Sequence, residues 1–310
     1  MIVFYFRYLI KEFIGFLILK SGLFRLILFL SKEEAKLIIL NYHNFSKYNN
    51  YKFKRGSILQ TDYSVNFEKQ IIFLKRYLTF LDPINFHEGN IEKKINLYIT
   101  FDDGYKDNFD IAFPILKKYN AKATFFIVTN IINSNNWLFH DKLRYLISTG
   151  LISQRIAEKY LKQMNSNIPL PKSIFNLVSN YKFPKNKRLM MNWHELFQIK
   201  SDIFKVQPHT HNHSILSFLN YEEQKKEIIN SINSIELNLK NSINYFAYPN
   251  GLYNNSTKDL LKSLNIKYAF TTIPGVNNMK TDTLQMKRIG VNVSDSIGVI
   301  CLKIILNLKK

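Results

Sequence analysis

The sequence lacks several features that would place it in a specialised class. It contains a single cysteine, Cys301, so an internal disulfide framework is excluded and nothing in the chain requires an oxidising compartment. No internal repeat or low-complexity linker interrupts the 310 residues. Hydrophobic residues make up 46% of the chain, which argues against disorder and supplies enough apolar material for one large domain or two small ones.

Long hydrophobic runs are also missing. Residues 1–30 are strongly apolar, but charges interrupt them, and their uncharged runs are far shorter than the roughly 20 residues of a membrane-spanning helix. No small-residue cleavage site marks a secretory signal. Two interpretations of residues 1–32 stay open: a basic amphipathic helix in the membrane interface, or a helix packed on the domain's own surface. We expect a cytoplasmic protein, peripheral on a membrane in the first case, and an extracytoplasmic location also stays open.

Negative charge is scarce, with 43 basic against 23 acidic residues and a formal net charge of +20. Such a balance is found in proteins that bind nucleic acid or anionic membranes. The lysines are scattered, however, and form no long basic block. No recognisable nucleic-acid-binding module accompanies them, so we expect no nucleic-acid partner.

Strand and helix patterns alternate along the chain. Apolar, β-branched segments predict strands at 36–41, 97–101, 123–128, 203–206, 243–248, 268–271 and 287–291. Helical patterns lie between most of them, and residues 131–190 read as a helical insertion. Polar motifs repeatedly follow the strands, which indicates an α/β fold of about seven strands, a βα barrel with its active face at one end. We predict a catalytic domain at 33–295 and an amphipathic C-terminal tail at 296–310.

Two polar motifs stand out at predicted strand ends. Asp102 and Asp103 close the strand that begins near Leu97, on a turn that Gly104 permits. By itself this pair is equally explained as a simple turn. Downstream, His209 and His213 follow another strand with three residues between them. Two histidines and a carboxylate leave coordination positions open for water and substrate, as a hydrolytic metal site requires.

These motifs resemble those of the polysaccharide deacetylases, the NodB-homology group of carbohydrate esterases. The resemblance spans about 37–295 and includes the segments 40–43, 100–104, 123–126, 209–213, 246–251 and 288–291. It implies a distorted TIM-like (β/α) barrel and a divalent metal, most often Zn²⁺. It also implies hydrolysis of an N-acetyl group, or less often an O-acetyl group, on a sugar of a surface polysaccharide or glycolipid.

The resemblance also implies roles for single residues. Asp103, His209 and His213 would hold the metal. Asp102 would be the general base, accepting a proton from the attacking water. Tyr248 and Asn250 would lie against the substrate, with a backbone N–H near Asn250 stabilising the oxyanion.

The chain departs from the family pattern twice. Ala247 stands where the family often has an arginine that orients the base, and we expect Arg288, in a late strand, to replace it. No histidine follows His213, although the family's general acid usually lies there. A permuted branch takes that acid from an early Tyr-His motif, so we expect His43 to protonate the leaving amine.

Other interpretations follow from these departures. His43 can instead be a buried strand-end histidine bound to backbone, and the protein can be a catalytically impaired carbohydrate-binding relic of the same fold. The remaining histidines, including His140, have no ligand-like spacing, and we expect them at the surface or at helix caps.

Overall fold

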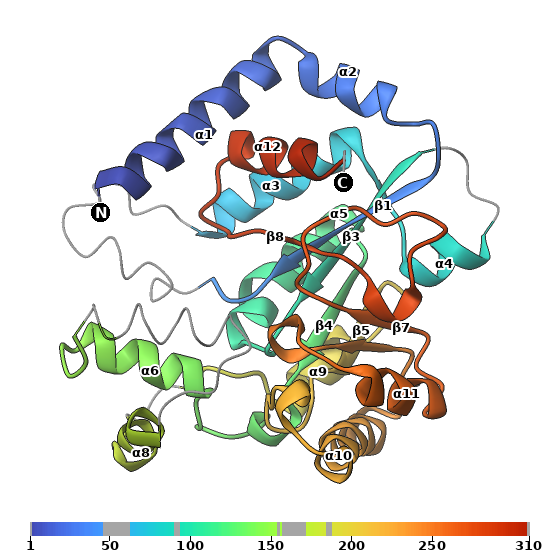
Figure 1. Cartoon of the computed structure of the whole chain (residues 1–310). Coiled ribbons are helices and arrows are strands. Elements are labelled where there is room, and N and C mark those ends of the chain that lie inside the picture. Colours follow the sequence, from blue (N-terminus) through green and yellow to red (C-terminus); the bar gives the residue numbers. More distant parts are fainter. Residues whose placement is uncertain are drawn as a thin grey trace.

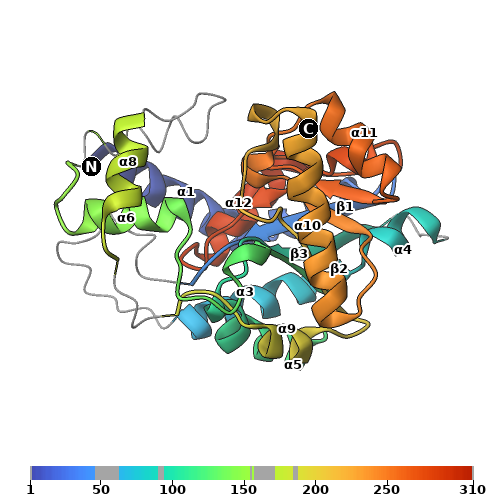
Figure 2. The same ribbon diagram turned by 90° about the horizontal axis from the view of Figure 1, so that it is seen from below.

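The computed structural model describes residues 2–45, 63–89, 94–153, 156, 172–183 and 188–308. Residues 154–155, 157–171 and 184–187 of the predicted insertion lie outside this description. Of the insertion it describes α6 (Phe139–Ser148) and α8 (Lys172–Asn180), which pack together beside the main body (Figures 1 and 2).

Parallel strands form the centre of the molecule. Five of them pair in the order β5 (Phe204–Pro208), β4 (Ala123–Ile127), β3 (Ile95–Phe101), β1 (Lys36–Tyr42) and β8 (Ile289–Gly290). The short strand β2 (Thr79–Phe80) pairs with β3, and β6 (Tyr245–Ala247) pairs with β7 (Tyr268–Phe270) in a second sheet. Every pairing between these strands is parallel. The predicted α/β class is therefore confirmed.

The two sheets are linked at both edges without forming one continuous barrel. At one edge the Gln207 side chain takes the place of backbone hydrogen bonds between β5 and β6. Its Oε1 accepts from the backbone N–H groups of Asn244 and Tyr245 at 3.0 and 2.8 Å. At the other edge Phe270 forms a parallel bridge with Met286, and the chain then continues into β8 beside β1. The described strands are thus consistent with the distorted barrel that the sequence predicts, but they do not close into one.

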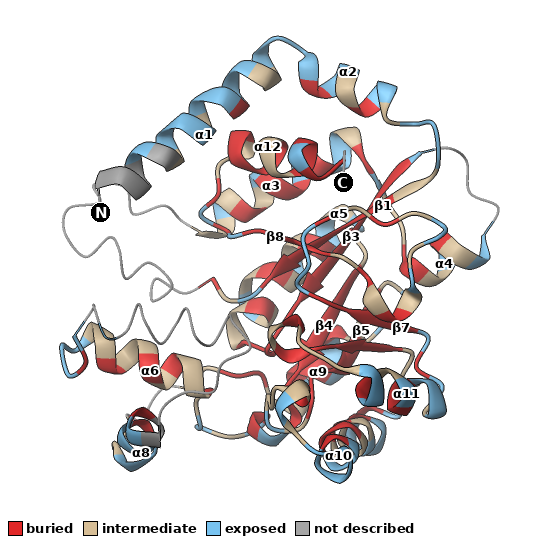
Figure 3. Cartoon of the chain, viewed as in Figure 1, coloured by how far each residue is buried: buried red, intermediate tan, exposed pale blue. Residues whose placement is uncertain are grey.

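Side chains alternate along the strands, so one set forms an inner hydrophobic core and the other set forms an outer hydrophobic core under the helices. Leu37, Ile39, Tyr98 and Phe126 join residues of β6 and β7 in an interior cluster. Their neighbours in the strands pack outward, against the surrounding helices. Since side chains alternate with a period of two, Thr100 and Asp102 lie on the same inner face as Tyr98. Figure 3 shows the resulting buried centre.

Helices cover the outside of the strands. They are α3 (Tyr63–Tyr77), α4 (Pro83–Glu88), α5 (Phe113–Tyr119), α9 (Trp193–Ile199), α10 (Tyr221–Leu239) and α11 (Asn255–Ser263). Three of them begin with a capping box, in which Asn192, Asn220 or Asn254 accepts from the backbone N–H three residues on. Such caps satisfy N–H groups that would otherwise lack partners, so these helix starts are set locally by sequence.

The two ends of the chain pack together. Helix α1 (Ile2–Lys20), followed by α2 (Leu23–Leu30), crosses α12 (Ile297–Leu308) at the top of Figure 1. Gly15 and Gly298 meet at the crossing, where a Cβ added to Gly15 would lie 2.1 Å from the Gly298 carbonyl oxygen. The predicted tail is thus a helix, and Ile300, Cys301 and Ile304 tie it into the main core.

By length and composition no single described helix suffices to cross a membrane, whereas Tyr8–Lys20 and Leu23–Leu30 would qualify as a pair bent by 78°.

Candidate metal centre and catalytic residues

The strand register gathers the predicted site residues at one edge. Tyr42 of β1 lies opposite Phe101 of β3, so His43 and Asp102 are the next residues along two adjacent strands. Ile127 of β4 lies opposite Pro208 of β5, and His209 follows directly. Because all these strands are parallel, their carboxyl ends share one edge, which is where (β/α) barrels place their active sites.

The positive φ angle of Asp103 allows its side chain and that of Asp102 to lie at the same site. Alternation would turn Asp103 away from Asp102, but Asp103 has φ 77°, and Gly104 follows with φ 85°. The loop after β5 is also in the left-handed region at Thr210 (φ 65°) and His213 (φ 60°). Such conformations are costly for residues other than glycine and persist where the surrounding structure enforces them, often at functional sites.

Asp103, His209 and His213 converge in the interior. Asp103 Oδ1 lies 3.3 Å from Nε2 of His213 and 3.7 Å from Nε2 of His209. One ligand atom from each of the three residues lies within 4.8 Å of the other two. Asp103 and His209 are buried, whereas His213 retains some exposure. The predicted cluster of one carboxylate and two imidazoles is therefore present as a candidate metal site.

The protonation state of His209 suits a metal ligand. Nδ1 of His209 lies 2.8 Å from the Ala247 carbonyl oxygen, to which only a protonated Nδ1 can donate. Burial lowers the pKa of His209 to about 4, so the ring is neutral and its Nε2 lone pair faces the cluster. A backbone partner of this kind commonly orients a metal-binding histidine. Ala247, which stands where the family often has an arginine, thus contributes to the site through its backbone carbonyl group.

Asp103 shows most directly that the cluster suits a cation. Both carboxylate oxygens are buried, and within the described part of the chain neither accepts a well-formed hydrogen bond. Burial opposes its ionisation, but the nearby imidazoles, His213 first, hold its pKa well below the ordinary value. A buried, ionised carboxylate without donors is costly unless a cation neutralises it. With neutral His209 beside it, the set matches the Asp/His chemistry of divalent metals such as zinc.

Asp102 occupies a different environment. Arg288 Nη1 and Nη2 donate to its Oδ1 and Oδ2, each at 2.7 Å, and the Asn41 amide donates to Oδ2 at 3.0 Å. Burial alone would raise the pKa of this carboxyl, but the Arg288 guanidinium outweighs it and the pKa lies below its ordinary value. Asp102 is therefore held ionised, in one orientation, beside the cluster.

Arg288 is itself rigidly placed. It is 1% exposed, its Nε donates to the Thr271 carbonyl oxygen at 2.8 Å, and its Nη1 reaches Thr100 Oγ1 at 3.2 Å. The guanidinium also lies over the Phe126 ring, 5.9 Å from its centroid. The structure thus places Arg288, which directly precedes β8, in bidentate contact with Asp102.

His140 corrects the sequence interpretation. We expected it at the surface or a cap, yet α6 places its Nε2 3.5 Å from Asp103 Oδ2, and its ring packs edge-on against His213. The Tyr105 hydroxyl donates to Asp141 at 2.8 Å and lies 2.7 Å from His140 Nε2. Burial holds the pKa of His140 well below its ordinary value. No spacing signal indicates this residue, because it lies on the insertion, far from every motif.

His43 lies on the loop directly after β1. Its side chain is exposed, unlike the buried strand-end histidine of the alternative interpretation. Asn108 Nδ2 donates to its carbonyl oxygen at 2.7 Å, and the Phe45 N–H donates to Asp107 Oδ2, also at 2.7 Å. These two hydrogen bonds fix the loop at His43 and at Phe45. His43 also contributes to lowering the pKa of Asp102, so it acts within electrostatic range of the site.

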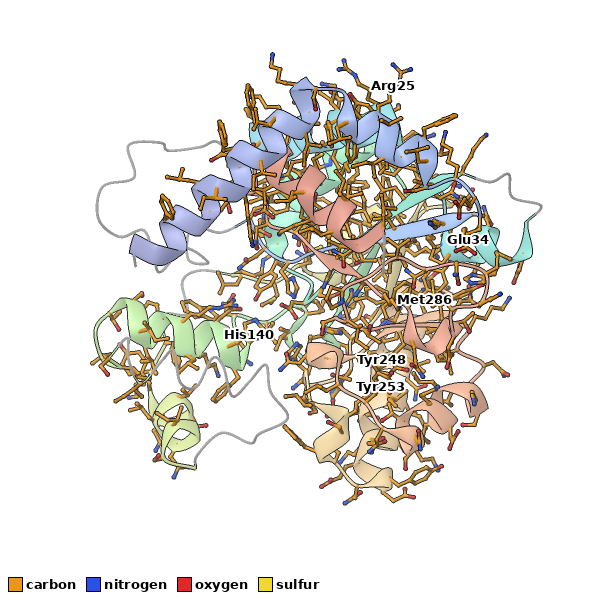
Figure 4. The ribbon with its side chains drawn as sticks, turned by 45° about the horizontal axis from the view of Figure 1, so that its top comes forward. Arg25, Glu34, His140, Tyr248, Tyr253 and Met286 are labelled. Atoms are coloured by element: carbon orange, nitrogen blue, oxygen red, sulfur yellow. The ribbon has the colours of Figure 1, made fainter. Side chains whose placement is uncertain are left out.

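Tyr248 and Asn250 lie on the segment after β6. The Tyr248 side chain is buried, and its hydroxyl donates to the Leu284 carbonyl oxygen at 2.9 Å, which does not favour direct substrate contact. Asn250 has φ 55° and, with Gly251 and Tyr253, lines an open cavity of about 620 Å³. Figure 4 shows Tyr248 and Tyr253 close together, apart from His140.

The fold and this cluster define a class of protein, and comparison with known families agrees. Residues 89–269, more than half of the chain, match the family model described as polysaccharide deacetylase. The chain belongs to this family. The prediction of a hydrolase that removes acetyl groups from carbohydrate is thereby confirmed.

Two staphylococcal proteins are similar to this chain in sequence. The chain is 27% identical over 261 residues to a poly-beta-1,6-N-acetyl-D-glucosamine N-deacetylase of Staphylococcus aureus, covering 78% of this chain and 74% of the relative. It is 31% identical over 191 residues to the protein of the same name from Staphylococcus epidermidis, covering 52% and 65%.

Solved structures support the fold. The deacetylase PplD of Streptococcus pyogenes aligns with a TM-score of 0.59 at 22% identity, covering 86% of this chain and 96% of that one. IcaB from Ammonifex degensii aligns with a TM-score of 0.57 at 19% identity, covering 86% and 97%.

Proposed function

We propose that the protein is a metal-dependent de-N-acetylase of an amino-sugar polymer resembling poly-β-1,6-N-acetylglucosamine. The observation that supports the proposal most strongly is that the two aspartates have different surroundings. Arg288 and Asn41 fix Asp102, whereas Asp103 faces two histidines and, among the described residues, accepts no well-formed hydrogen bond. The names of the staphylococcal relatives support the choice of polymer.

Asp103, His209 and His213 would hold the metal, for which we propose Zn²⁺. A divalent ion there supplies Lewis-acid activation of water and of the acetyl carbonyl. The chain's own residues carry the protons. Asp102 accepts one from the water that attacks the carbonyl carbon, and its ionised state at neutral pH makes it competent to do so.

Arg288 keeps the Asp102 carboxylate in the orientation that receives this proton. His43, exposed at the site edge, then protonates the departing amine, so that the C–N bond breaks to give acetate and a free amine. A backbone N–H near Asn250 stabilises the oxyanion, in line with preorganised donors in other acyl-transfer enzymes; Pro249 has no N–H, and Gly251 donates its own to the Tyr248 carbonyl oxygen at 2.8 Å.

A product assay tests the proposal. The protein is incubated with β-1,6-linked N-acetylglucosamine oligomers, β-1,4-linked ones and an O-acetylated sugar, and acetate and free amine are measured separately. We expect equal amounts of both from the β-1,6 oligomers. Acetate without amine would instead show an O-deacetylase.

The metal and the base are tested in the same assay. Chelator treatment abolishes turnover if the metal site is essential, and adding back Zn²⁺, Co²⁺ or Ni²⁺ in turn identifies the ion that restores it. Asp102→Asn retains the side chain's shape but cannot accept the proton. Full activity of this variant would disprove the assigned base, and an inactive wild-type protein that still binds the oligomers would favour the carbohydrate-binding relic.

A further inference from the structure

The largest accumulation of exposed apolar side chains lies on α1 and α2, away from the site. Eleven of the 23 exposed large hydrophobic residues of the described chain belong to these two helices. They are Phe6, Leu9, Ile10, Phe13, Ile14, Phe16, Leu17, Leu23, Leu26, Phe29 and Leu30. Apolar surface of this extent on one face marks an interaction site in a soluble protein.

These helices are an integral part of the fold. Gly15 packs against Gly298 of α12 at a distance that leaves no room for a side chain, and the Tyr8 hydroxyl donates to the Ser294 carbonyl oxygen at 3.3 Å. Phe24 and Leu28 anchor α2 in the main core. The domain therefore holds one face of each helix and presents the other outward, where α1 and α2 form the upper boundary in Figure 1.

The charges on the two helices favour one kind of partner. Between residues 2 and 30 the sequence has four basic residues, Arg7, Lys11, Lys20 and Arg25, and one acidic residue, Glu12. Lys11, Lys20 and Arg25 are exposed, and Figure 4 shows Arg25 projecting from the top of the molecule. Aromatic and aliphatic side chains combined with a basic edge are typical of helices that lie in the interface of an anionic membrane.

We propose that the outward face of α1 and α2 docks on an anionic lipid bilayer and lies within its interface. The contact at Gly15 excludes a spanning arrangement in the folded protein, because the middle of α1 stays against α12. The phenyl and leucyl side chains enter the acyl boundary, while Lys11, Lys20 and Arg25 meet the headgroups. The proposal stands on the surface alone and does not depend on the substrate.

Vesicle flotation of the full chain tests the docking surface. The vesicles contain phosphatidylcholine alone or phosphatidylcholine mixed with phosphatidylglycerol. The variant Phe13→Glu/Leu26→Glu changes two outward residues, and the matched control Phe197→Glu/Leu237→Glu makes the same changes on α9 and α10. We expect the first to bind mixed vesicles at least about tenfold more weakly than wild type and the control to bind like wild type.

A second variant tests the charge and leaves every apolar contact in place. Lys20→Gln/Arg25→Gln should weaken binding to mixed vesicles by roughly fivefold for each charge removed, with little change on phosphatidylcholine alone. If the glutamate variant fails to fold, this variant decides the result.

Three outcomes would overturn the proposal. They are a wild-type protein that does not float, equal binding of all variants, and a dimer in light scattering that Phe13→Glu/Leu26→Glu dissolves while no form binds vesicles. The last result would assign the face to a second copy of the chain.

Discussion

The ion pair between Asp102 and Arg288 gives a prediction with a defined magnitude. Arg288→Met removes the guanidinium and leaves the Asp102 carboxylate, which is 2% exposed, with the Asn41 amide as its remaining side-chain donor in the described structure. Breaking a buried pair from one side costs about 3–5 kcal/mol, because the other charge stays buried without compensation. We expect the metal-free variant to lose about that much unfolding free energy at pH 7.

The loss should depend on Asp102 and on pH. Adding Asp102→Asn removes the uncompensated charge, so the double variant should recover about 1–3 kcal/mol of the loss. In the wild type the pKa of Asp102 is lowered, so its ionisation stabilises the fold above the unfolded pKa, and this contribution disappears as the pH falls through the folded pKa. In Arg288→Met burial raises the pKa instead, so the gap to wild type should narrow on acidification.

Urea denaturation in the presence of chelator, followed by circular dichroism, measures these differences. A matched control is Arg188→Met, which breaks the 2.7 Å pair with Glu195 where Arg188 is 27% exposed, and should cost about 1 kcal/mol. A loss from Arg288→Met no larger than that of the control, or no recovery in the double variant, would refute the assigned ion pair.

Further predictions concern the surroundings of the site and the terminal helices. His140→Ala should weaken metal binding by about 10–100-fold in chelator competition, because it removes the imidazole that lies 3.5 Å from Asp103 Oδ2. His194→Ala, on the surface of α9, is the control and should leave metal binding unchanged. Burial raises the pKa of Asp107 to about 7, so its folded form stays protonated where the unfolded form ionises, and stability should fall by about 1.4 kcal/mol per pH unit between about pH 4 and 7. Asp107→Asn should flatten that slope in urea titrations, and an unchanged slope would contradict it. Gly298→Ala should lower the midpoint of thermal unfolding, because its Cβ would lie 3.0 Å from backbone atoms of α1; a midpoint equal to wild type would show that the helices separate at no cost.

The central elements of the fold were predictable because they depend on local patterns. Apolar, β-branched runs predict β1 and β3 to β8, whereas no such run marks β2, which has two residues. The link between β5 and β6 could not be predicted, since it depends on one side chain, Gln207, reaching a neighbouring segment. The packing of α12 beneath α1 also depends on a contact between opposite ends of the chain.

The metal cluster was predictable from motif spacing and family resemblance, and Arg288 from the position of its strand. The backbone angles that bring Asp102 and Asp103 to one face leave no clear sequence signal. His140 could not be found, because its place depends on how the insertion folds back over the site. Long-range packing of this kind is not encoded in any short segment.

The crossing of Gly15 and Gly298 has a consequence for synthesis. At about 5–20 residues per second, α12 leaves the ribosome roughly 15–60 s after α1. Throughout that interval α1 lacks α12, its main packing partner, and the inward face of α1 is as uncovered as its outward one. Helix α12 therefore completes the packing of α1, which reaches its final environment only once α12 has been synthesised.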